Sequence, residues 1–324
     1  MEIGSFIELQ FPCGLEYHTE DKYGKDNIAR LNSGRAAIWH AFRLTECSAI
    51  WLPYYQCETV RDFLYKKGCT VKFYHIDKNF YPTDIEQSGN EAVLIVNYFG
   101  IMSKERLENT AKKFKNVIVD NSQGFFAQPI EDCFNVYSCR KFVGVPDGAY
   151  VIGNGAKKHT DEYPQGYSSD TSQFLLQRIE YGCEGKTYRS REINENRIDN
   201  EDIMKMSLLT HRILNGTDYG FISDKRRENF KIGNKLFANI NKINPLMSYD
   251  ETCVPMVYPL VVEDDTLLKK MLDNKHFQGH WWNYLLTEMP KDSVEYYISR
   301  YVIPITIDQR YSEEDLFFIR NIID

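Results

Sequence analysis

A lysine near the middle of the chain has neighbours that could support nucleophilic chemistry. Two apolar runs typical of strands, Phe134–Tyr137 and Ala149–Val151, flank a polar elbow that holds Ser138, Arg140 and Lys141. Burial and a neighbouring cation both disfavour the charged form of an amine, and a neutral amine can attack a carbonyl group. Lys141 is therefore a candidate catalytic residue, although an ordinary turn lysine would give the same local sequence.

A second candidate site lies at the start of a predicted helix. Ser33 is a good N-cap, and Gly34 and Arg35 follow it at the first helical positions. The free N–H groups of a helix start, together with a hydroxyl and a guanidinium, suit a phosphate group. A plain capped helix with a surface arginine explains the same three residues, so this segment alone leaves the choice open.

The elements that must position these residues form an alternating pattern of strands and helices. Strands are predicted at 49–53, 70–74, 92–97 and 117–120, with helices at 58–67 and 103–114 among them. Such alternation argues for an α/β fold with a doubly wound, mostly parallel sheet. In these sheets ligands bind beyond the carboxyl ends of the strands. The polar residues at the strand exits should therefore meet at one edge, and they are Tyr54, Tyr55, Asn97, Tyr98, Asp120–Gln123 and Ser138–Lys141.

Composition and motifs argue against several classes of protein. The net charge of −7 gives no basic surface for nucleic acid, and the apolar runs are too short to span a membrane. The eight cysteines form no C-x-x-C pair and suggest reduced thiols in the cytoplasm. The seven histidines lack metal-ligand spacing, so no metal site is predicted. A signal-peptide start and the motifs of serine hydrolases, kinases and dinucleotide-binding enzymes are also missing.

The order and spacing of these motifs resemble those of one enzyme family. The motifs are Ser33-Gly34-Arg35 before a helix, Pro53 followed by a helix that stops at Gly68, Asp120-Asn-Ser-Gln123, and Ser138 with Lys141 before Gly144-Val-Pro-Asp-Gly148. Together they resemble the DegT/StrS-type aminotransferases, which are fold-type-I enzymes that use pyridoxal 5′-phosphate (PLP). Each motif is short, so the resemblance rests on their order along most of the chain.

The resemblance implies a catalytic role for three residues. Lys141 would form the internal aldimine with PLP and then move the proton between the substrate Cα and the cofactor C4′. Asp120 would pair with the pyridine nitrogen and keep it protonated, so that the ring can act as an electron sink. Gln123 would lie beside the phenolic oxygen or the ring face of the cofactor.

The same resemblance implies a phosphate site. Ser33, Gly34 and Ser138 would hold the phosphate of PLP, with Arg35 as an addition in this chain. The gap between Ser138 and Lys141 is shorter than is usual in the family. This departure leaves the geometry of the lysine relative to the phosphate open.

Two further departures concern the cofactor ring and a partner subunit. The position where an aromatic side chain commonly stacks on the ring holds Cys57, so stacking would fall to Tyr54 or Tyr55 or would be weaker. The segment that a partner subunit usually contributes after the lysine is replaced by a charged stretch at Tyr181–Arg191. Both departures put the substrate in doubt more than the cofactor.

The last third of the chain predicts a smaller second domain. Residues 153–200 show weak periodicity apart from a helical pattern at Gln173–Ile179, which suits either a lid or intersubunit loop or a solvated connection. Helices are predicted at 201–214 and 224–237, strands at 256–262 and 296–303, and a capped final helix from Ser312. We therefore expect a large α/β domain at 1–200 and a small α+β domain at 201–324.

The function implied by the resemblance is amino transfer. The chain would be a homodimeric PLP-dependent aminotransferase that moves an amino group from an amino acid such as glutamate to a keto-sugar linked to a nucleotide. Relatives that dehydrate sugars replace the lysine by histidine, so Lys141 favours amino transfer. Another fold-type-I reaction, such as that of a lyase, remains an alternative. A member without turnover that acts as a binding or assembly protein is a second one.

Overall fold

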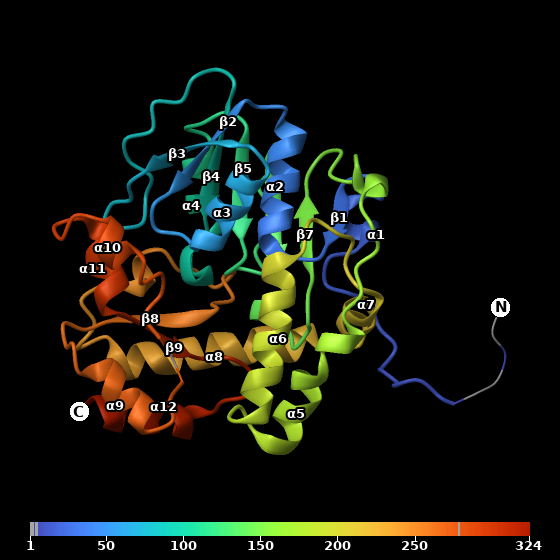
Figure 1. The fold of residues 1–324 in the computed structure, drawn as a ribbon. Coiled ribbons are helices and arrows are strands. Elements are labelled where there is room, and N and C mark those ends of the chain that lie inside the picture. The colour runs from blue at the N-terminus through green and yellow to red at the C-terminus, as the bar shows by residue number, and fades with distance from the viewer. Residues whose placement is uncertain (1–2, 4–5, 278) are drawn as a thin grey trace.

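The computed structural model describes residue 3, residues 6–277 and residues 279–324, and its central feature is a seven-stranded sheet (Figure 1). The strands are β1 (Ile28–Leu31), β2 (Ala49–Pro53), β3 (Thr70–Tyr74), β4 (Glu91–Val96), β5 (Val117–Asn121), β6 (Phe134–Ser138) and β7 (Ala149–Ile152). Their order in the sheet is β1-β7-β6-β5-β4-β2-β3. Neighbours from β6 to β3 are parallel, whereas β7 runs antiparallel to both β6 and β1. The predicted α/β fold with a mostly parallel sheet is confirmed.

Continuous apolar sequence explains the centre of this sheet. Every residue of β4 and β5 is buried, as expected for strands that helices cover on both faces. The register pairs Val96 with Asp120 and Asp120 with Val136. The carboxyl ends of three neighbouring strands therefore lie side by side, which places their following residues at one edge.

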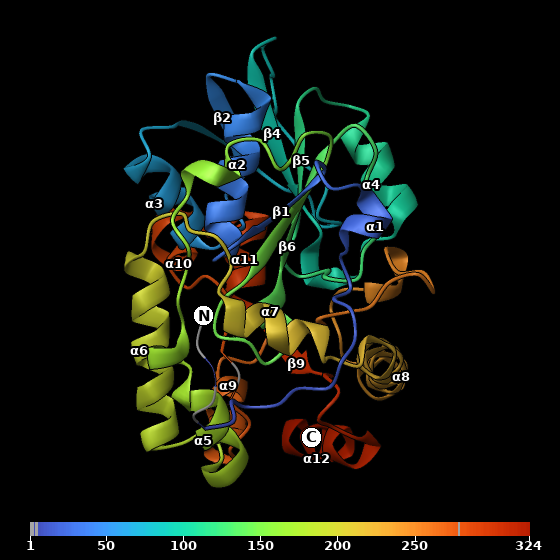
Figure 2. The same cartoon turned by 90° about the vertical axis from the view of Figure 1, so that its right-hand side faces the viewer.

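Helices cover both faces of the sheet. They are α2 (Gly34–Thr45), α3 (Glu58–Lys66) and α4 (Lys104–Ala111), and a short α1 (Glu20–Tyr23) precedes β1. Figure 2 shows α4 on the opposite side of the sheet from α2 and α3. No helix in the described part of the chain is both long and apolar enough to cross a membrane.

The C-terminal part is built on a two-stranded antiparallel sheet of β8 (Val257–Val261) and β9 (Val302–Thr306). Its helices are α8 (Tyr219–Phe237), α9 (Leu267–Asp273), α10 (Leu285–Glu288), α11 (Val294–Tyr301) and α12 (Glu313–Ile323). The predicted capping box of the last helix is present, with Ser312 and Asp315 bonded to each other's backbone. The division of the chain at residue 200 stays a prediction.

Two predicted elements differ in the structure. Residues 296–303, predicted as a strand, form most of α11 and only the start of β9, because Ser293 caps a helix by accepting from the backbone N–H of Tyr296 at 3.2 Å. The helix predicted at 201–214 begins at Leu208 instead and is α7 (Leu208–Asn215). Before it the chain lies along β1, where the Met206 N–H donates to the Arg30 carbonyl at 3.2 Å. The backbone of this segment thus finds hydrogen-bond partners at the edge of β1, whereas in a helix its partners would lie within the segment itself.

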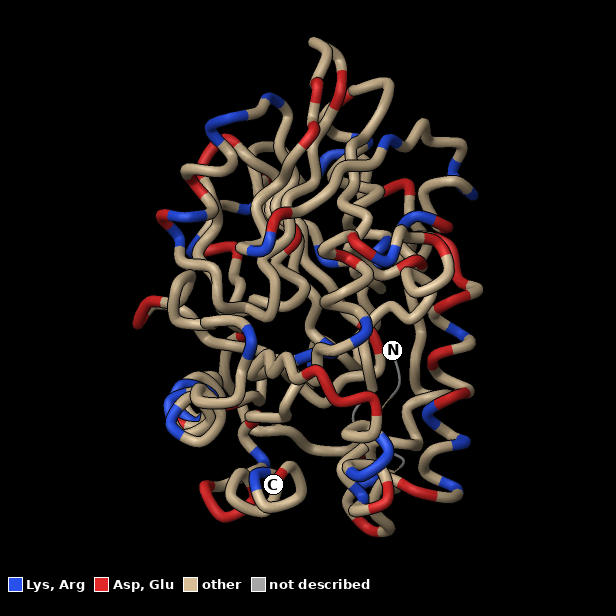
Figure 3. The backbone as a smooth tube through the Cα atoms, turned by 90° about the vertical axis from the view of Figure 1, so that its left-hand side faces the viewer, with Lys and Arg blue, Asp and Glu red and all other residues tan. Residues whose placement is uncertain are grey.

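A helical hairpin between the two parts was only half predicted. The pattern at Gln173–Ile179 corresponds to α5 (Gln173–Tyr181), but α6 (Lys186–Asn200) lies in sequence that was read as loop. Figure 3 shows basic and acidic residues alternating along α6. A helix that is polar on most of its surface has little periodicity to reveal it, which is why the sequence did not predict it.

The N-terminal arm that precedes α1 is fixed by one buried carboxylate. The Glu16 carboxylate accepts from the Tyr150 hydroxyl at 2.6 Å and from Arg30 Nε at 2.8 Å, and His211 Nδ1 lies 3.3 Å from it. Burial alone would raise the pKa of Glu16, but the bonds from His211, Arg30 and Tyr150 outweigh it and lower the pKa to about 2. The arm is therefore held to β1, β7 and α7 by a charged group.

This carboxylate predicts a pH dependence of stability. A depressed folded pKa means that the unfolded chain binds the proton more tightly, so the stabilisation is complete above about pH 4.5 and is lost as the pH falls towards 2. The contribution of Glu16 is about 3 kcal/mol, since one pKa unit is ~1.4 kcal/mol. Urea unfolding between pH 6 and 3 should show a flatter pH slope for Glu16→Gln than for wild type. The exposed Glu8→Gln is the control, and equal slopes for Glu16→Gln and wild type would contradict the assignment.

Candidate functional site

Three segments meet at the start of α2 and form a small polar cradle. Ser33 caps the helix and is buried, and its hydroxyl accepts from the Ala36 N–H at 3.4 Å. A Cβ added to Gly34 would lie 3.3 Å from the Ser122 hydroxyl and 3.8 Å from the Ser138 Cβ. Glycine thus lets two hydroxyl-bearing residues approach the positive end of a helix closely. This arrangement suits an anion.

Asp120, at the end of β5, is buried and held at both oxygens. Its Oδ1 accepts from the Ser122 N–H at 2.8 Å, and Gln56 Nε2 donates to its Oδ2 at 3.4 Å. Asp120 and Ser138 lie on neighbouring parallel strands. The carboxylate is therefore fixed one strand away from the cradle, as a rigid acceptor.

Sequence reasoning missed two residues of this site. Ser122 lies within the Asp120–Gln123 motif but has no role in the resemblance, and Gln56 belongs to none of the motifs. Gln56 is buried, and the loop that carries it is held by the Tyr284 hydroxyl, which donates to the Gln56 carbonyl at 2.8 Å. The signal in the sequence that could have indicated Gln56 is its place as a polar residue three positions after Pro53, at a strand exit.

Gln123 has a backbone partner in the structure. Its Oε1 accepts from the Phe99 N–H at 2.7 Å, and Phe99 lies at φ +60° in the turn η1 (Tyr98–Gly100) that follows β4. A bulky residue rarely adopts this conformation, so the bond helps to hold an unfavourable turn. A contact between Gln123 and a cofactor stays a prediction.

Lys141 lies where the sequence placed it along the chain but not in the predicted environment. It ends the turn η2 (Cys139–Lys141) after β6, and its side chain is exposed. Within the described residues its ammonium has no hydrogen-bond or ion-pair partner. The expected burial is therefore wrong for the single chain, because the buried faces of this turn are Cys139 and Phe142.

The two residues expected near the cofactor ring have different environments. Tyr55 is fully buried against Tyr98 and Trp282, so its ring has no open face in this structure, and a contact with a cofactor stays a prediction. Cys57 is partly exposed and precedes α3, where its Sγ lies 3.2 Å from the Thr59 hydroxyl. Of the two, only Cys57 is accessible.

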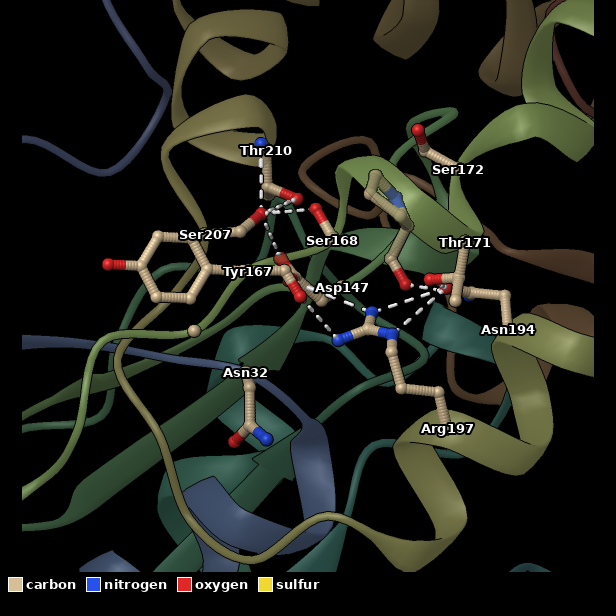
Figure 4. A network of polar contacts seen from close by, with 12 residues as sticks. Asn32, Asp147, Tyr167, Ser168, Thr171, Ser172, Asn194, Arg197, Ser207 and Thr210 are labelled. Atoms are coloured by element: carbon tan, nitrogen blue, oxygen red, sulfur yellow. Dashed lines mark hydrogen bonds and ion pairs between the residues drawn. The ribbon is translucent and has the colours of Figure 1, made fainter.

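The turn after Lys141 is tied to α6 and α7 by a polar network (Figure 4). Asp147 is fully buried, its Oδ1 accepts from the Ser207 hydroxyl at 3.1 Å, and Arg197 Nη2 lies 3.8 Å from its Oδ2. Burial raises the pKa of Asp147. Asn194 Nδ2 also donates to the Pro146 carbonyl at 2.9 Å. The network fixes the path of the chain that leaves the lysine.

Arg35 and Arg140, on either side of the cradle, are bound to α6. Arg35 Nη2 lies 2.5 Å from Asp199 Oδ1, and Arg140 forms an ion pair with Glu195. The predicted contact of Arg35 with a cofactor phosphate therefore competes with a carboxylate of the same chain. The sequence gave no sign of this competition.

The strand order and the polar strand exits define the fold of the fold-type-I PLP-dependent enzymes, and solved structures agree. The sugar aminotransferase CalS13 from Micromonospora echinospora is 14% identical, with 96% of this chain and 92% of that chain covered and a TM-score of 0.62. A DegT DnrJ EryC1 StrS aminotransferase from Brucella abortus is 14% identical, with 94% and 87% covered and a TM-score of 0.62. The GDP-4-keto-6-deoxy-D-mannose-3-dehydratase of E. coli, solved with hydrated PLP, is 12% identical, with 94% and 89% covered and a TM-score of 0.62.

The resemblance predicted from the motifs is thus confirmed at the level of the fold. No protein-family model matches the sequence, and no curated protein matches it. At 12–14% identity the solved structures establish the architecture of the chain. Its activity has to be argued from its own residues.

Proposed function

We propose that this chain is a PLP-dependent aminotransferase that transfers an amino group from an amino acid, such as glutamate, to a keto-sugar linked to a nucleotide. The observation that carries the proposal is the convergence of the Gly34 cradle, the Asp120 carboxylate and the lysine-bearing turn at one sheet edge. Sugar aminotransferases share this fold. The pathway would be one that builds amino sugars for a polysaccharide or a related product.

The residues at the edge suit PLP as the cofactor. The start of α2, where Gly34 lies close to Ser122 and Ser138, would take its phosphate. The buried Asp120 would pair with the protonated pyridine nitrogen through a charge-assisted hydrogen bond. When bound, PLP supplies an electron sink that makes the proton on the substrate Cα acidic.

Lys141 would supply the reactive amine. It would bind the aldehyde carbon of the cofactor and would move the proton at the substrate Cα. The Asp147 network would hold the turn behind the lysine at a constant position. Gln56 would keep one oxygen of Asp120 oriented while the other accepts from the backbone.

We also propose that the active form is a homodimer. Apolar side chains on and around the α5–α6 hairpin are more than half exposed, and they are Tyr167, Leu176, Ile179, Tyr181, Tyr188 and Ile193. A surface of this kind is usually covered by a partner. A second copy could also enclose the exposed Lys141. Analytical ultracentrifugation that shows only monomers at micromolar concentration would rule out a stable dimer.

A reducing compartment fits the cysteines. All eight are unpaired in the structure, including the buried Cys139 and Cys253. Burial raises the pKa of both thiols. Unpaired thiols in this number are typical of proteins from the cytoplasm, where we place the chain.

The direct test of function is reconstitution with PLP followed by an amino donor. The purified protein should gain a visible absorbance band with PLP, and L-glutamate should shift it into the ultraviolet as the amino group moves to the cofactor. D-glutamate is the control. A protein without the band would favour the binding or assembly alternative, and a band that neither glutamate nor glutamine changes would contradict amino transfer from these donors.

A further inference from the structure

Two arginines beside the cradle face carboxylates of the same chain. Arg35 follows Gly34 directly and pairs with Asp199, whereas Arg140 lies between Ser138 and Lys141 and pairs with Glu195. Glu195 and Asp199 are four residues apart on α6, so they project from one face of that helix. One helix therefore supplies counter-ions to both arginines.

The positive charge at this corner is concentrated. Burial lowers the pKa of Arg140. The charges of Arg191 and Arg35 lower this pKa further, whereas Glu195 raises it. Arg191 Nε also lies 3.9 Å from Glu195. The guanidinium groups of Arg35, Arg140 and Arg191 thus share the carboxylates of Glu195 and Asp199. The excess of positive charge would favour a further anion at this place.

The positive end of α2 adds to this charge. Figure 1 shows the C-terminal end of α6, which carries both carboxylates, next to the N-terminal end of α2. An anion at this place interacts with the helix start as well as with the guanidinium groups. The two carboxylates therefore occupy a position that also suits a phosphoryl group.

The geometry of the pairs makes the carboxylates replaceable. The arginine side chains are 9% and 24% exposed, whereas those of Asp199 and Glu195 are 51% and 35% exposed. Ion pairs with such solvated partners contribute little to stability. A phosphoryl group offers more charge and three acceptor oxygens that match the guanidinium fork.

The helix itself need not move for this exchange. Asn194 and Ile198 are buried, and Asn194 holds the Pro146 carbonyl at 2.9 Å. Rotation of the Glu195 and Asp199 side chains alone would free the arginines. The exchange then requires only the rotation of two side chains, while the backbone of α6 stays in place.

We propose that Arg35 and Arg140 form a binding site for a phosphoryl group beside the cradle, and that Glu195 and Asp199 occupy this site until the ligand displaces them. The phosphoryl group belongs either to the cofactor or to the diphosphate of the nucleotide-linked substrate. The inference rests on the proposed function for the identity of its ligands. Its charge chemistry can be tested without that function.

The first experiment measures the binding of inorganic pyrophosphate to the protein without PLP, by isothermal titration calorimetry at low salt. The variant Glu195→Gln/Asp199→Asn should bind about tenfold more tightly, because the competing charges are gone. The control Glu180→Gln/Glu192→Gln carries the same change of net charge at exposed positions of α5 and α6, and its affinity should equal that of wild type. Equal affinity for the two double variants would overturn the proposal.

The arginines provide the complementary measurement. Arg140→Gln should weaken pyrophosphate binding about tenfold, whereas Arg189→Gln, at an exposed position of α6, should leave it unchanged. Thermal unfolding followed by circular dichroism checks that each variant is folded. Should Arg140→Gln fail to fold, Arg35→Gln gives the same test. An unchanged affinity in the folded variant would overturn the role of that arginine.

A last comparison identifies the source of the phosphoryl group. The titration is repeated after PLP has been fixed to the protein with borohydride, so that the cradle is filled. A persistent effect of Glu195→Gln/Asp199→Asn on pyrophosphate assigns the site to the substrate diphosphate. An effect on PLP affinity alone assigns it to the cofactor phosphate. If Glu195→Gln/Asp199→Asn changes the affinity for neither pyrophosphate nor PLP, the proposal is overturned, even if the protein is an active aminotransferase. If the variant changes the affinity for pyrophosphate in a protein that never turns over, the proposal is supported.

Discussion

Lys141→Ala is expected to remove the visible absorbance band that PLP gives with the wild-type protein. The amine of Lys141 is the group at this turn that can condense with the aldehyde carbon of the cofactor to give an imine and water, and alanine has none. Turnover with glutamate should fall at least about 10³-fold, because the same amine would move the proton at the substrate Cα. PLP could still bind through the cradle and Asp120, so equilibrium dialysis should show a weaker but measurable affinity.

The measurement needs a control for the loss of a surface lysine. Lys112→Ala removes an exposed lysine after α4 and should leave both the band and its loss on borohydride treatment unchanged. Primary amines such as ethylamine, added to Lys141→Ala with PLP, should restore part of the proton transfer. A normal band in Lys141→Ala would show that another lysine holds the cofactor.

The exposure of Lys141 bears on how this result is interpreted. The single chain leaves the side chain open to solvent, so burial within one subunit is not what prepares the amine. A cofactor and a second copy are the two groups that could cover it. The lysine variant and the oligomeric state therefore have to be examined under the same conditions.

The parallel core was predictable because its sequence is simple. β4 and β5 contain the continuous apolar runs 92–96 and 117–119, and a strand buried on both faces requires such a run. α11 was read as a strand because Tyr296–Tyr301 is rich in aromatic and β-branched residues, and only the cap at Ser293 marks it as a helix. β1 was missed because its partner β7 lies more than 100 residues away along the chain.

The candidate site was predictable in position but not in detail. Strand exits had to share one edge, so the place of Ser138 beside Asp120 followed from the topology. The approach of Ser138 to Gly34 was implied by the resemblance alone, since β1, which leads into Gly34, was not predicted. The directions in which the side chains point could not be predicted from the topology. Neither the contact of Gln56 with Asp120 nor the pairing of Arg140 with Glu195 leaves a periodic signal in the sequence.

Asp120→Ala should separate cofactor binding from catalysis. The carboxylate is buried, and the Ser122 N–H and the Gln56 amide fix its two oxygens, so it would offer the pyridine nitrogen a rigid acceptor. Without it the ring nitrogen would lose its proton at neutral pH, and the electron sink would weaken. The band with PLP should still form, whereas the rate of the glutamate half-reaction should fall about 10²- to 10⁴-fold.

Stopped-flow absorbance measures this rate directly, and a graded series tests the cause. Gln56→Leu keeps the carboxylate but removes its side-chain donor, so its rate should lie between those of wild type and Asp120→Ala. Asp161→Ala, at a fully exposed carboxylate, should match wild type. An undiminished half-reaction in a folded Asp120→Ala would remove Asp120 from the mechanism. The pyridine nitrogen would then need another partner at this edge.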